Sequence, residues 1–449
     1  MLTGALDSAL FSAWRRRELA RFDAIGVTYL DYTGAAPFPE SVVAAEPTRL
    51  LGGILGNPHS EHLASRLATS DLEAARAAIL EFLGAEPAEY QVVLTSNASA
   101  AIRLVAESFP FGPDTPLVLS QDNHNSVNGI RAFAAARGAE TTWLPLDRDL
   151  RLVAPVDWPK DRGKGGLFAY PAQSNFSGVR HPLSLVADAQ VRGLRVLLDA
   201  ASFLHAGAID FRVARPDFIV LSVYKIAGYP SGIGALVARP EALAELRRPW
   251  FAGGTVDWVT TSPAGHQLKA GAERFEDGTP SFLAAGAVPP ALRAVGSVNR
   301  VHLAEHLRTL TERLLVDFGE LRHGTGQPVV AIHGPSTMRD RGATIAFSVL
   351  GVRGGVVPFW EVEAAARDAG LALRGGCFCN PGCAERAFSV GTTRMADAVA
   401  ALGEDFTIPR LAELLGTNAV GALRVSLGLG STMEDVSRVV AFLHQFRVS

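Results

Sequence analysis

An aspartate and a lysine stand at the ends of two consecutive apolar runs in the middle of the chain. Asp199 closes the run RVLLD, and Lys225 follows the run DFIVLS 26 residues later. If the two runs are neighbouring strands, both side chains enter one crevice. There a carboxylate can keep a pyridine nitrogen protonated, and a desolvated amine can form imines. The spacing alone equally allows an aspartate that caps the next helix and a lysine on the surface.

Hydroxyl-bearing residues flank the predicted start of a helix. The stretch 95–99, Thr-Ser-Asn-Ala-Ser, leaves a predicted strand and enters a helix, and Ser222 stands three residues before Lys225. Backbone N–H groups at a helix N-terminus, with hydroxyls beside them, can hold a phosphate, although ordinary helix caps look the same. His124 follows another predicted strand and could stack on an aromatic ring, but a lone loop histidine is more often structural.

The segment 374–383, RGGCFCNPGC, contains all three cysteines of the chain, Cys377, Cys379 and Cys383. Cysteines this close together, with no distant partner, cannot form a disulfide framework and indicate thiol chemistry in a reducing compartment. A glycine-rich loop suits a nucleophile that must reach a substrate, with Arg374 favouring the thiolate and Gly375-Gly376 serving as a hinge. The spacing lacks a fourth zinc ligand, so we predict no metal site.

These candidates lie among apolar runs that alternate with helical patterns between residues 70 and 240. Continuous apolar strands separated by helices predict a mainly parallel sheet covered on both faces, with ligands beyond the carboxyl ends of the strands. Amphipathic helices are predicted at 71–83 and 98–107. The predicted strands are 90–95, 116–120, 141–145, 166–170, 195–199, 217–222 and 233–237.

After a long amphipathic helix at 299–322 the pattern restarts, and the Gly- and Arg-bearing stretch 322–344 is predicted to be a loop region. The predicted elements are helices 361–369, 408–415 and 432–446 and strands 371–373 and 422–426. We therefore predict an N-terminal helical segment (1–28), a large domain (29–298) and a smaller α+β domain (299–449) that carries the cysteine loop.

Bulk composition excludes several functions. Of the 449 residues, 48% are hydrophobic and 19% charged, and 42 basic against 45 acidic side chains give a formal charge of −3. That balance predicts neither a nucleic-acid nor a membrane partner. A short apolar N-terminal stretch precedes Arg15, Arg16 and Arg17, which is the reverse order of a secretory signal and favours a cytoplasmic protein.

Taken in order, ten stretches between residues 29 and 445 resemble the pyridoxal-phosphate-dependent cysteine desulfurase branch of the class V aminotransferases. They are most similar to the N-terminal desulfurase domain of molybdenum cofactor sulfurases. Tyr224 and Ser202 depart from many bacterial desulfurases and agree with the sulfurase branch. The stretches are YLDYTGAAP, GNPHS, LTSNASAAIRLVAESFP, NHNSVNGIR, FAYPAQSNFSGVRHPL, LLDAASF, SVYKIAGYPSGIGAL, ERFEDGTPS, LRGGCFCNPGC and ALRVSLG.

The resemblance implies the α/β fold type I of pyridoxal-phosphate enzymes, with a mainly parallel seven-stranded sheet and a smaller C-terminal α+β domain. It implies a homodimer, in which Thr279 reaches the phosphate of the partner subunit. It also assigns cofactor contacts: Lys225 for the imine, Asp199 for the pyridine nitrogen, His124 for ring stacking, Asn175 for the phenolic oxygen, and Ala98, Ser99 and Ser222 for the phosphate.

For the substrate, the resemblance implies that Arg424, assisted by Arg374, binds a carboxylate and that Cys379 is the nucleophile. The expected reaction converts L-cysteine to L-alanine, leaves a persulfide on Cys379 and passes sulfur to an acceptor. We expect no C-terminal molybdenum-cofactor-binding domain, so the acceptor stays open. Open alternatives are another class V reaction on an amino acid (C–S or selenocysteine lyase, aminotransferase or epimerase) and a non-catalytic scaffold with a relic cofactor pocket.

Overall fold

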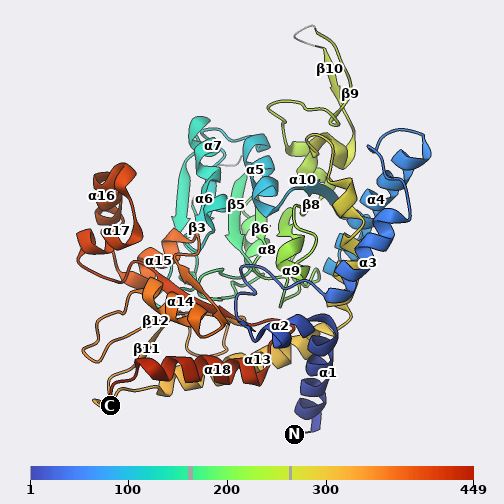
Figure 1. Ribbon diagram of the computed structural model, residues 1–449. Coiled ribbons are helices and arrows are strands. Elements are labelled where there is room, and N and C mark those ends of the chain that lie inside the picture. The colour runs from blue at the N-terminus through green and yellow to red at the C-terminus, as the bar shows by residue number, and fades with distance from the viewer. Residues whose placement is uncertain (1, 160–164, 262–264) are drawn as a thin grey trace.

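A seven-stranded sheet forms the centre of the computed structural model, which describes residues 2–159, 165–261 and 265–449 (Figure 1). The strand order is β2-β8-β7-β6-β5-β3-β4. β8 runs antiparallel to both of its neighbours, and the other pairings are parallel. All seven predicted strands are therefore confirmed, as is the mainly parallel sheet. The strands are β2 (Gln91–Thr95), β3 (Leu117–Ser120), β4 (Thr141–Leu144), β5 (Gly166–Pro171), β6 (Leu194–Asp199), β7 (Phe218–Ser222) and β8 (Gly234–Ala238).

Helices cover both faces of this sheet, which explains why its strands are apolar throughout. In β7, Ile219 and Leu221 join one core cluster, whereas Phe218 and Val220 join another on the opposite face. The first face packs against α4 (Leu63–Leu83), α8 (Leu185–Gln190) and α12 (Val288–Gly296). The second packs against α5 (Ala98–Ser108), α7 (Ile130–Ala136) and α10 (Pro240–Glu245).

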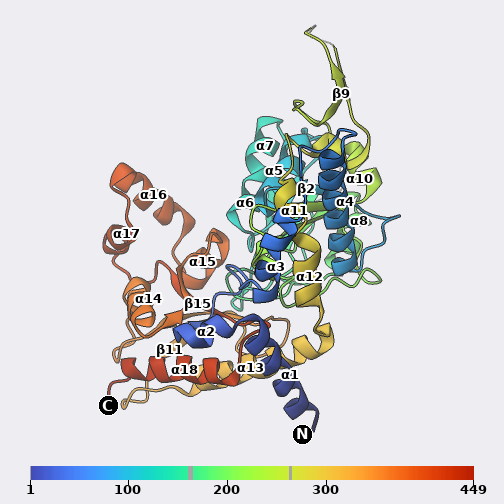
Figure 2. The same cartoon turned by 45° about the vertical axis from the view of Figure 1, so that its right-hand side comes forward.

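A second sheet, in the order β11-β12-β15-β14, lies in the C-terminal part. Its antiparallel strands are β11 (Val330–His333), β12 (Thr344–Val349), β14 (Arg374–Gly376) and β15 (Ala422–Ser426). The interpretation of 322–344 as a loop was wrong at 330–333, because β11 pairs with β12. The long predicted helix is α13 (Arg300–Glu320), which contacts α18 (Met433–Leu443), and the two lie side by side in Figures 1 and 2.

The N-terminal helix α1 (Leu2–Glu18) packs on the C-terminal part of the chain. Phe11 and Trp14 are buried in the same core cluster as α13 and the second sheet. Thr28 and Leu371 add a parallel pairing between β1 (Thr28–Tyr29) and β13 (Leu371–Ala372). The segment after α1 is therefore tied to the C-terminal part, and the division at residues 28 and 298 stays a prediction.

The remaining elements connect these layers or project from them. In Figure 1 the β9–β10 hairpin projects from one end of the molecule, and α16 and α17 stand apart beside α15. These elements are α2 (Ala20–Ile25), α3 (Glu40–Leu51), α6 (Asn125–Asn128), α9 (Val223–Ala227), β9 (Val256–Val259), β10 (His266–Leu268), α11 (Phe282–Ala285), α14 (Phe359–Asp368), α15 (Pro381–Phe388), α16 (Thr392–Leu402) and α17 (Ile408–Leu415).

Within the described ranges, none of the helices combines the length and the apolar character needed to cross a membrane.

Candidate active site

Asp199 and Lys225 lie at the carboxyl ends of two neighbouring parallel strands. Asp199 is the last residue of β6 and pairs with Val220 of β7, and Lys225 lies in α9 just after β7. The Asp199 side chain is buried, and its Oδ1 accepts a hydrogen bond from the Ala201 N–H at 2.9 Å. Burial lowers the pKa of Lys225, and Asp199 opposes that shift while Arg424 adds to it. The lysine is thus a desolvated amine beside a carboxylate, as imine chemistry requires.

The turn after Lys225 needs a residue without a side chain. Gly228 has φ +71°, and a Cβ there would collide with the backbone of residues 36–38. The Ala36 N–H also donates to the Tyr224 carbonyl at 3.2 Å. The segment that follows β1 therefore packs directly against the lysine helix.

Three of the predicted phosphate ligands lie together where β2 and β7 end. The Ala98 N–H donates to Ser222 Oγ at 2.9 Å, at the first residue of α5. Ser99 Oγ lies 2.6 Å from Ser126 Oγ of the neighbouring helix α6. A helix N-terminus ringed by three hydroxyls favours an anion. Together with Asp199 and Lys225, this arrangement fits a cofactor that carries a phosphate and a pyridine ring.

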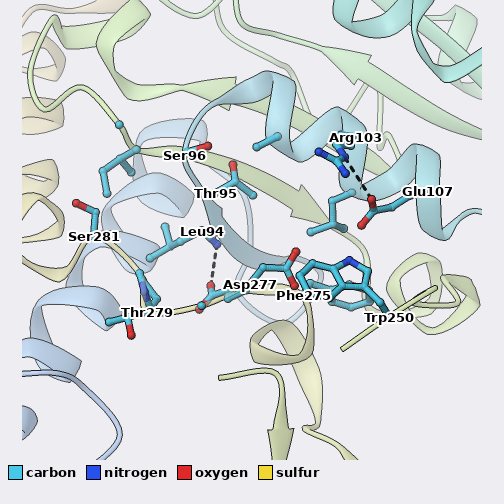
Figure 3. A pocket seen from close by; sticks show the side chains of 17 residues that line it. Leu94, Thr95, Ser96, Arg103, Glu107, Trp250, Phe275, Asp277, Thr279 and Ser281 are labelled. Atoms are coloured by element: carbon cyan, nitrogen blue, oxygen red, sulfur yellow. Dashed lines mark hydrogen bonds and ion pairs between the residues drawn. The ribbon is translucent and has the colours of Figure 1, made fainter. Parts of the chain in front are cut away.

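Thr279, which is predicted to reach the phosphate of a partner subunit, lies in the segment just before α11. It lines a cavity of about 410 Å³ together with Thr95, Ser96 and Ser281 (Figure 3). The lining of this cavity includes neither Ser222 nor Lys225. The contribution of Thr279 to a partner subunit's phosphate site stays a prediction.

His124 and Asn175 face the site from two further loops. His124 caps α6, and its Nδ1 accepts the Ser126 N–H at 3.1 Å. Burial lowers the pKa of His124, a shift that Asp199 opposes and Lys225 supports. A neutral imidazole suits stacking on a ring. Asn175 is buried in the loop after β5 and bonds to the cysteine loop.

The cysteine loop reaches these cofactor-site residues through its backbone. The Asn125 N–H, next to His124, donates to the Cys379 carbonyl at 2.7 Å, and Asn175 Nδ2 donates to the Phe378 carbonyl at 2.5 Å. Phe378 and Cys379 adopt φ values of +54° and +55°, which non-glycine residues seldom adopt. The Cys379 side chain is exposed. The loop therefore holds Cys379 in a turn whose backbone bonds to the residue after His124.

A buried carboxylate that the sequence analysis did not identify supports this turn. Asp122 is fully buried. Its Oδ1 accepts hydrogen bonds from Ser174 Oγ at 2.8 Å, Asn380 Nδ2 at 2.6 Å and Cys383 Sγ at 3.0 Å. Its Oδ2 lies 2.8 Å from His181 Nε2. Burial alone would raise the pKa of Asp122, but the hydrogen bond and charge of His181, together with the hydrogen bonds from Cys383 and Asn380, outweigh it and lower that pKa.

Asn380 connects this carboxylate to the cofactor loops. Its Nδ2 also donates to Asn175 Oδ1 at 3.0 Å, and its Oδ1 caps α15 by accepting the Cys383 N–H at 3.2 Å. Arg374–Gly376, predicted as the start of a hinged loop, forms β14 and pairs with β15. Contacts on both sides of Cys379 thus restrain the loop, and the expected hinge at Gly375-Gly376 is part of a sheet.

The three thiols lie in different environments. Cys383 is fully buried, and burial together with the charge of Asp122 raises its pKa well above the ordinary value. Cys377 donates to the Val420 carbonyl at 3.2 Å, and burial raises its pKa as well. All three cysteines are unpaired, and Cys379 alone among them is exposed. Since a nucleophile needs access and a reachable thiolate, Cys379 is the best placed.

We expect Asp122→Asn to destabilise the fold by about 3–5 kcal/mol at pH 7, because it removes the charge from a buried carboxylate that accepts hydrogen bonds on both oxygens. Because the folded pKa of Asp122 is lowered, its contribution is present above its unfolded pKa, near 4, and lost as the pH falls through the folded value. Urea unfolding at several pH values would measure this. Asp210→Asn, at an exposed carboxylate paired with Arg212, is the control and should not move the midpoint. An unaltered midpoint in Asp122→Asn at pH 7 would contradict the assignment.

Arg374 and Arg424 face each other across the β14–β15 pair and share a partner. Their Cα positions are in register. Asp31, which the sequence analysis did not identify, bonds to Arg424 Nη2 at 2.6 Å and to Arg374 Nη2 at 2.6 Å. Arg424 Nη1 donates to the Asn175 carbonyl at 2.7 Å. Arg424 is buried and Arg374 half-exposed. The arginine pair adjoins the lysine site, but Arg374 is engaged with a carboxylate rather than with a thiol.

Within residues 2–159, 165–261 and 265–449, no cluster of three or more His, Cys, Asp or Glu side chains is arranged to hold a metal ion.

The site combines a lysine and a carboxylate at strand ends with a helix N-terminus suited to a phosphate, and a restrained cysteine turn adjoins it. Comparison with known proteins shows which family this arrangement belongs to. Residues 28–439 match the aminotransferase class V family, and the chain is a member of it. Among its relatives is a molybdenum cofactor sulfurase of Bos taurus, 33% identical over 96% of this chain and 51% of that protein. Another, from Arabidopsis thaliana, is 32% identical over 96% of this chain and 57% of that protein. The chain thus spans about half the length of these relatives.

Solved structures show the same fold. A cysteine desulfurase from Thermococcus onnurineus superposes with a TM-score of 0.76 and 23% identity over 96% of both chains. A cysteine desulfurase from Escherichia coli gives a TM-score of 0.75 and 22% identity over 97% of this chain and 98% of the other. The predicted α/β fold type I and the class V resemblance are therefore confirmed.

Proposed function

We propose that this protein is a pyridoxal-phosphate-dependent cysteine desulfurase that converts L-cysteine to L-alanine and leaves a persulfide on Cys379. The observation that carries the proposal is the pair of hydrogen bonds that the Asn125 N–H and the Asn175 side-chain amide donate to the backbone carbonyls of the cysteine turn. They connect the exposed thiol to the two loops that flank the lysine site.

Different residues of the chain would bind the cofactor phosphate, the cofactor ring and the substrate carboxylate. Ala98, Ser99 and Ser222 would hold the cofactor phosphate, and His124 would stack on the ring. Asp199 would keep the ring nitrogen protonated. When bound, pyridoxal phosphate supplies an electron sink for the substrate Cα. Arg424 would bind the substrate carboxylate, since its buried Nε has no hydrogen-bond partner among the described residues.

The chemical work falls to Lys225 and Cys379. Lys225, whose lowered pKa leaves more of the amine neutral, takes the proton from the substrate Cα. The Cys379 thiolate then attacks the substrate sulfur. A sulfur–sulfur bond forms and the Cβ–S bond breaks. Cβ takes up the proton that the Cys379 thiol gave up, and Lys225 returns its proton to Cα, so that L-alanine is released and the substrate sulfur stays on Cys379 as the persulfide. Because the Cys379 side chain is exposed, an acceptor protein or small molecule can reach the persulfide.

We further propose a homodimer with two-fold symmetry. Thr279 is exposed, and the cavity that it lines includes neither Ser222 nor Lys225, which suits a contribution to the site of the partner subunit.

Incubation of the holoenzyme with L-cysteine tests the function. We expect L-alanine and protein-bound persulfide to form in equal amounts in the first turnover, and a reductant to release the sulfur and restart the reaction. Alanine without persulfide would favour a cysteine-independent lyase. Pyruvate and ammonia would indicate β-elimination. Either outcome would refute the desulfurase assignment.

A further inference from the structure

The carboxylate of Asp31 lies between the two arginines proposed to bind the substrate. Its Oδ1 accepts from Arg424 Nη2 at 2.6 Å, and its Oδ2 accepts from Arg374 Nε at 2.9 Å and Nη2 at 2.6 Å. Hydrogen bonds between two ions are roughly twice as strong as neutral ones. Both oxygens of one carboxylate therefore fix the orientation of both guanidinium groups.

The backbone holds this carboxylate in place. Asp31 forms a bridge with Ser426 of β15, and its carbonyl accepts the Gly34 and Ala35 N–H groups at 2.9 and 3.1 Å. A Cβ at Gly34 would collide with all three atoms of the Asp31 carboxyl group. The absence of a side chain at residue 34 is thus what leaves room for the carboxylate beside the arginines.

The hydrogen-bonding capacity that remains is small. Arg424 gives Nη1 to the Asn175 carbonyl and Nη2 to Asp31, and its Nε is buried without a partner among the described residues. Two arginines and Asp31 carry one net positive charge. Glu363 also lies near, and its charge adds to the hydrogen bond of Asp31 in raising the pKa of Arg374. It accepts a hydrogen bond from the Gly375 N–H at 2.9 Å and not from a guanidinium. The buried, unpartnered Nε donor of Arg424 favours one further anion.

We propose that Asp31 is a specificity-determining residue, which positions Arg374 and Arg424 and leaves them capacity for a single substrate carboxylate. The inference rests on the proposed function and gives a physical reason why the site would accept α-amino acids with one carboxylate and an uncharged side chain, the class to which L-cysteine belongs. One carboxylate neutralises the arginine pair. A second would find Nε and Nη2 of Arg374 already bonded to Asp31 and would meet the like charge of Asp31, which rejects it.

Asp31→Asn tests this by binding rather than turnover. The dissociation constants of L-alanine, the expected product, and L-aspartate, its dicarboxylate analogue, are measured on the holoenzyme by titration calorimetry. The wild type should prefer L-alanine. In Asp31→Asn the released Arg374 can take the second carboxylate, so the affinity for L-aspartate relative to L-alanine should rise about tenfold, the effect of one charge-assisted contact.

Two further variants distinguish an effect of where the Asp31 carboxylate lies from an effect of negative charge near the arginines. Glu363→Gln removes a carboxylate from the same neighbourhood that bonds to neither guanidinium, and it should leave the ratio within about twofold. Gly34→Ala keeps every charge but displaces the Asp31 carboxylate, so it should raise the ratio as Asp31→Asn does. If Asp31→Asn does not fold, Gly34→Ala still tests the role of Asp31.

The outcomes are distinguishable. If the wild type binds neither amino acid, both the proposed function and this inference are refuted. A wild type that binds L-alanine and forms persulfide, combined with an unchanged ratio in a folded Asp31→Asn or Gly34→Ala protein, overturns only the role of Asp31. If the affinity for L-aspartate relative to L-alanine rises equally in Glu363→Gln, the net charge of the neighbourhood, and not the Asp31 contact, sets the preference for L-alanine.

Discussion

Lys225→Ala should lower alanine release from L-cysteine by roughly 10⁴-fold, the upper range for loss of a general base. The variant should also lose the visible absorption band of the wild type, because no amine remains in the site to bind the cofactor covalently. The amine at this position is desolvated and faces Asp199, and a surface lysine would lack both properties. Absorbance spectra and an alanine assay on the same preparations measure the two effects.

Borohydride reduction identifies the residue directly. We expect the reduced cofactor to be recovered on Lys225 after proteolysis. Lys269→Ala is the matched control, because Lys269 forms a partly exposed ion pair with Glu273 at 2.9 Å and should keep the band and the activity. Recovery of the label on Lys269, or on Lys160 or Lys164, which lie outside the described residues, would refute the assignment.

The sheet could be predicted because burial on both faces leaves a clear pattern. Strands β6 and β7 are mostly apolar and each ends in a polar residue, so their ends also located Asp199 and Ser222. β11 was missed because its residues are only partly buried and a loop flanks it. β14 was missed because Gly375-Gly376 has weak strand propensity, and only the pairing with β15 orders it.

The supporting polar residues could not be predicted in the same way. Asp31 and Arg424 are 393 residues apart in the sequence, and Asp122 and Asn380 are 258 apart. Pairs so distant in the sequence leave no local pattern, because the partners of a buried polar side chain are set by the tertiary fold. Asp31 does lie inside the stretch YLDYTGAAP, directly after an apolar run. That charged residue at a strand end was the one available signal.

Cys379→Ala should abolish persulfide formation and lower alanine release by at least about 10³-fold. The spectral response to L-cysteine should persist, because Lys225, Asp199 and Arg424 are untouched and still bind the substrate. The variant removes an exposed side chain and leaves the backbone bonds of the turn in place, so its stability should hardly change. Stopped-flow absorbance and a persulfide label separate binding from sulfur transfer.

The other two thiols provide matched controls at the same loop. Cys383→Ala removes a buried donor to Asp122 and should cost about 1–3 kcal/mol of stability. Cys377→Ala removes a hydrogen bond to the Val420 carbonyl. Both should still form persulfide on Cys379, because neither thiol is exposed in the wild type. Unchanged alanine release in Cys379→Ala, or persulfide lost in Cys383→Ala at full stability, would place the nucleophile elsewhere and favour a class V reaction that does not use Cys379.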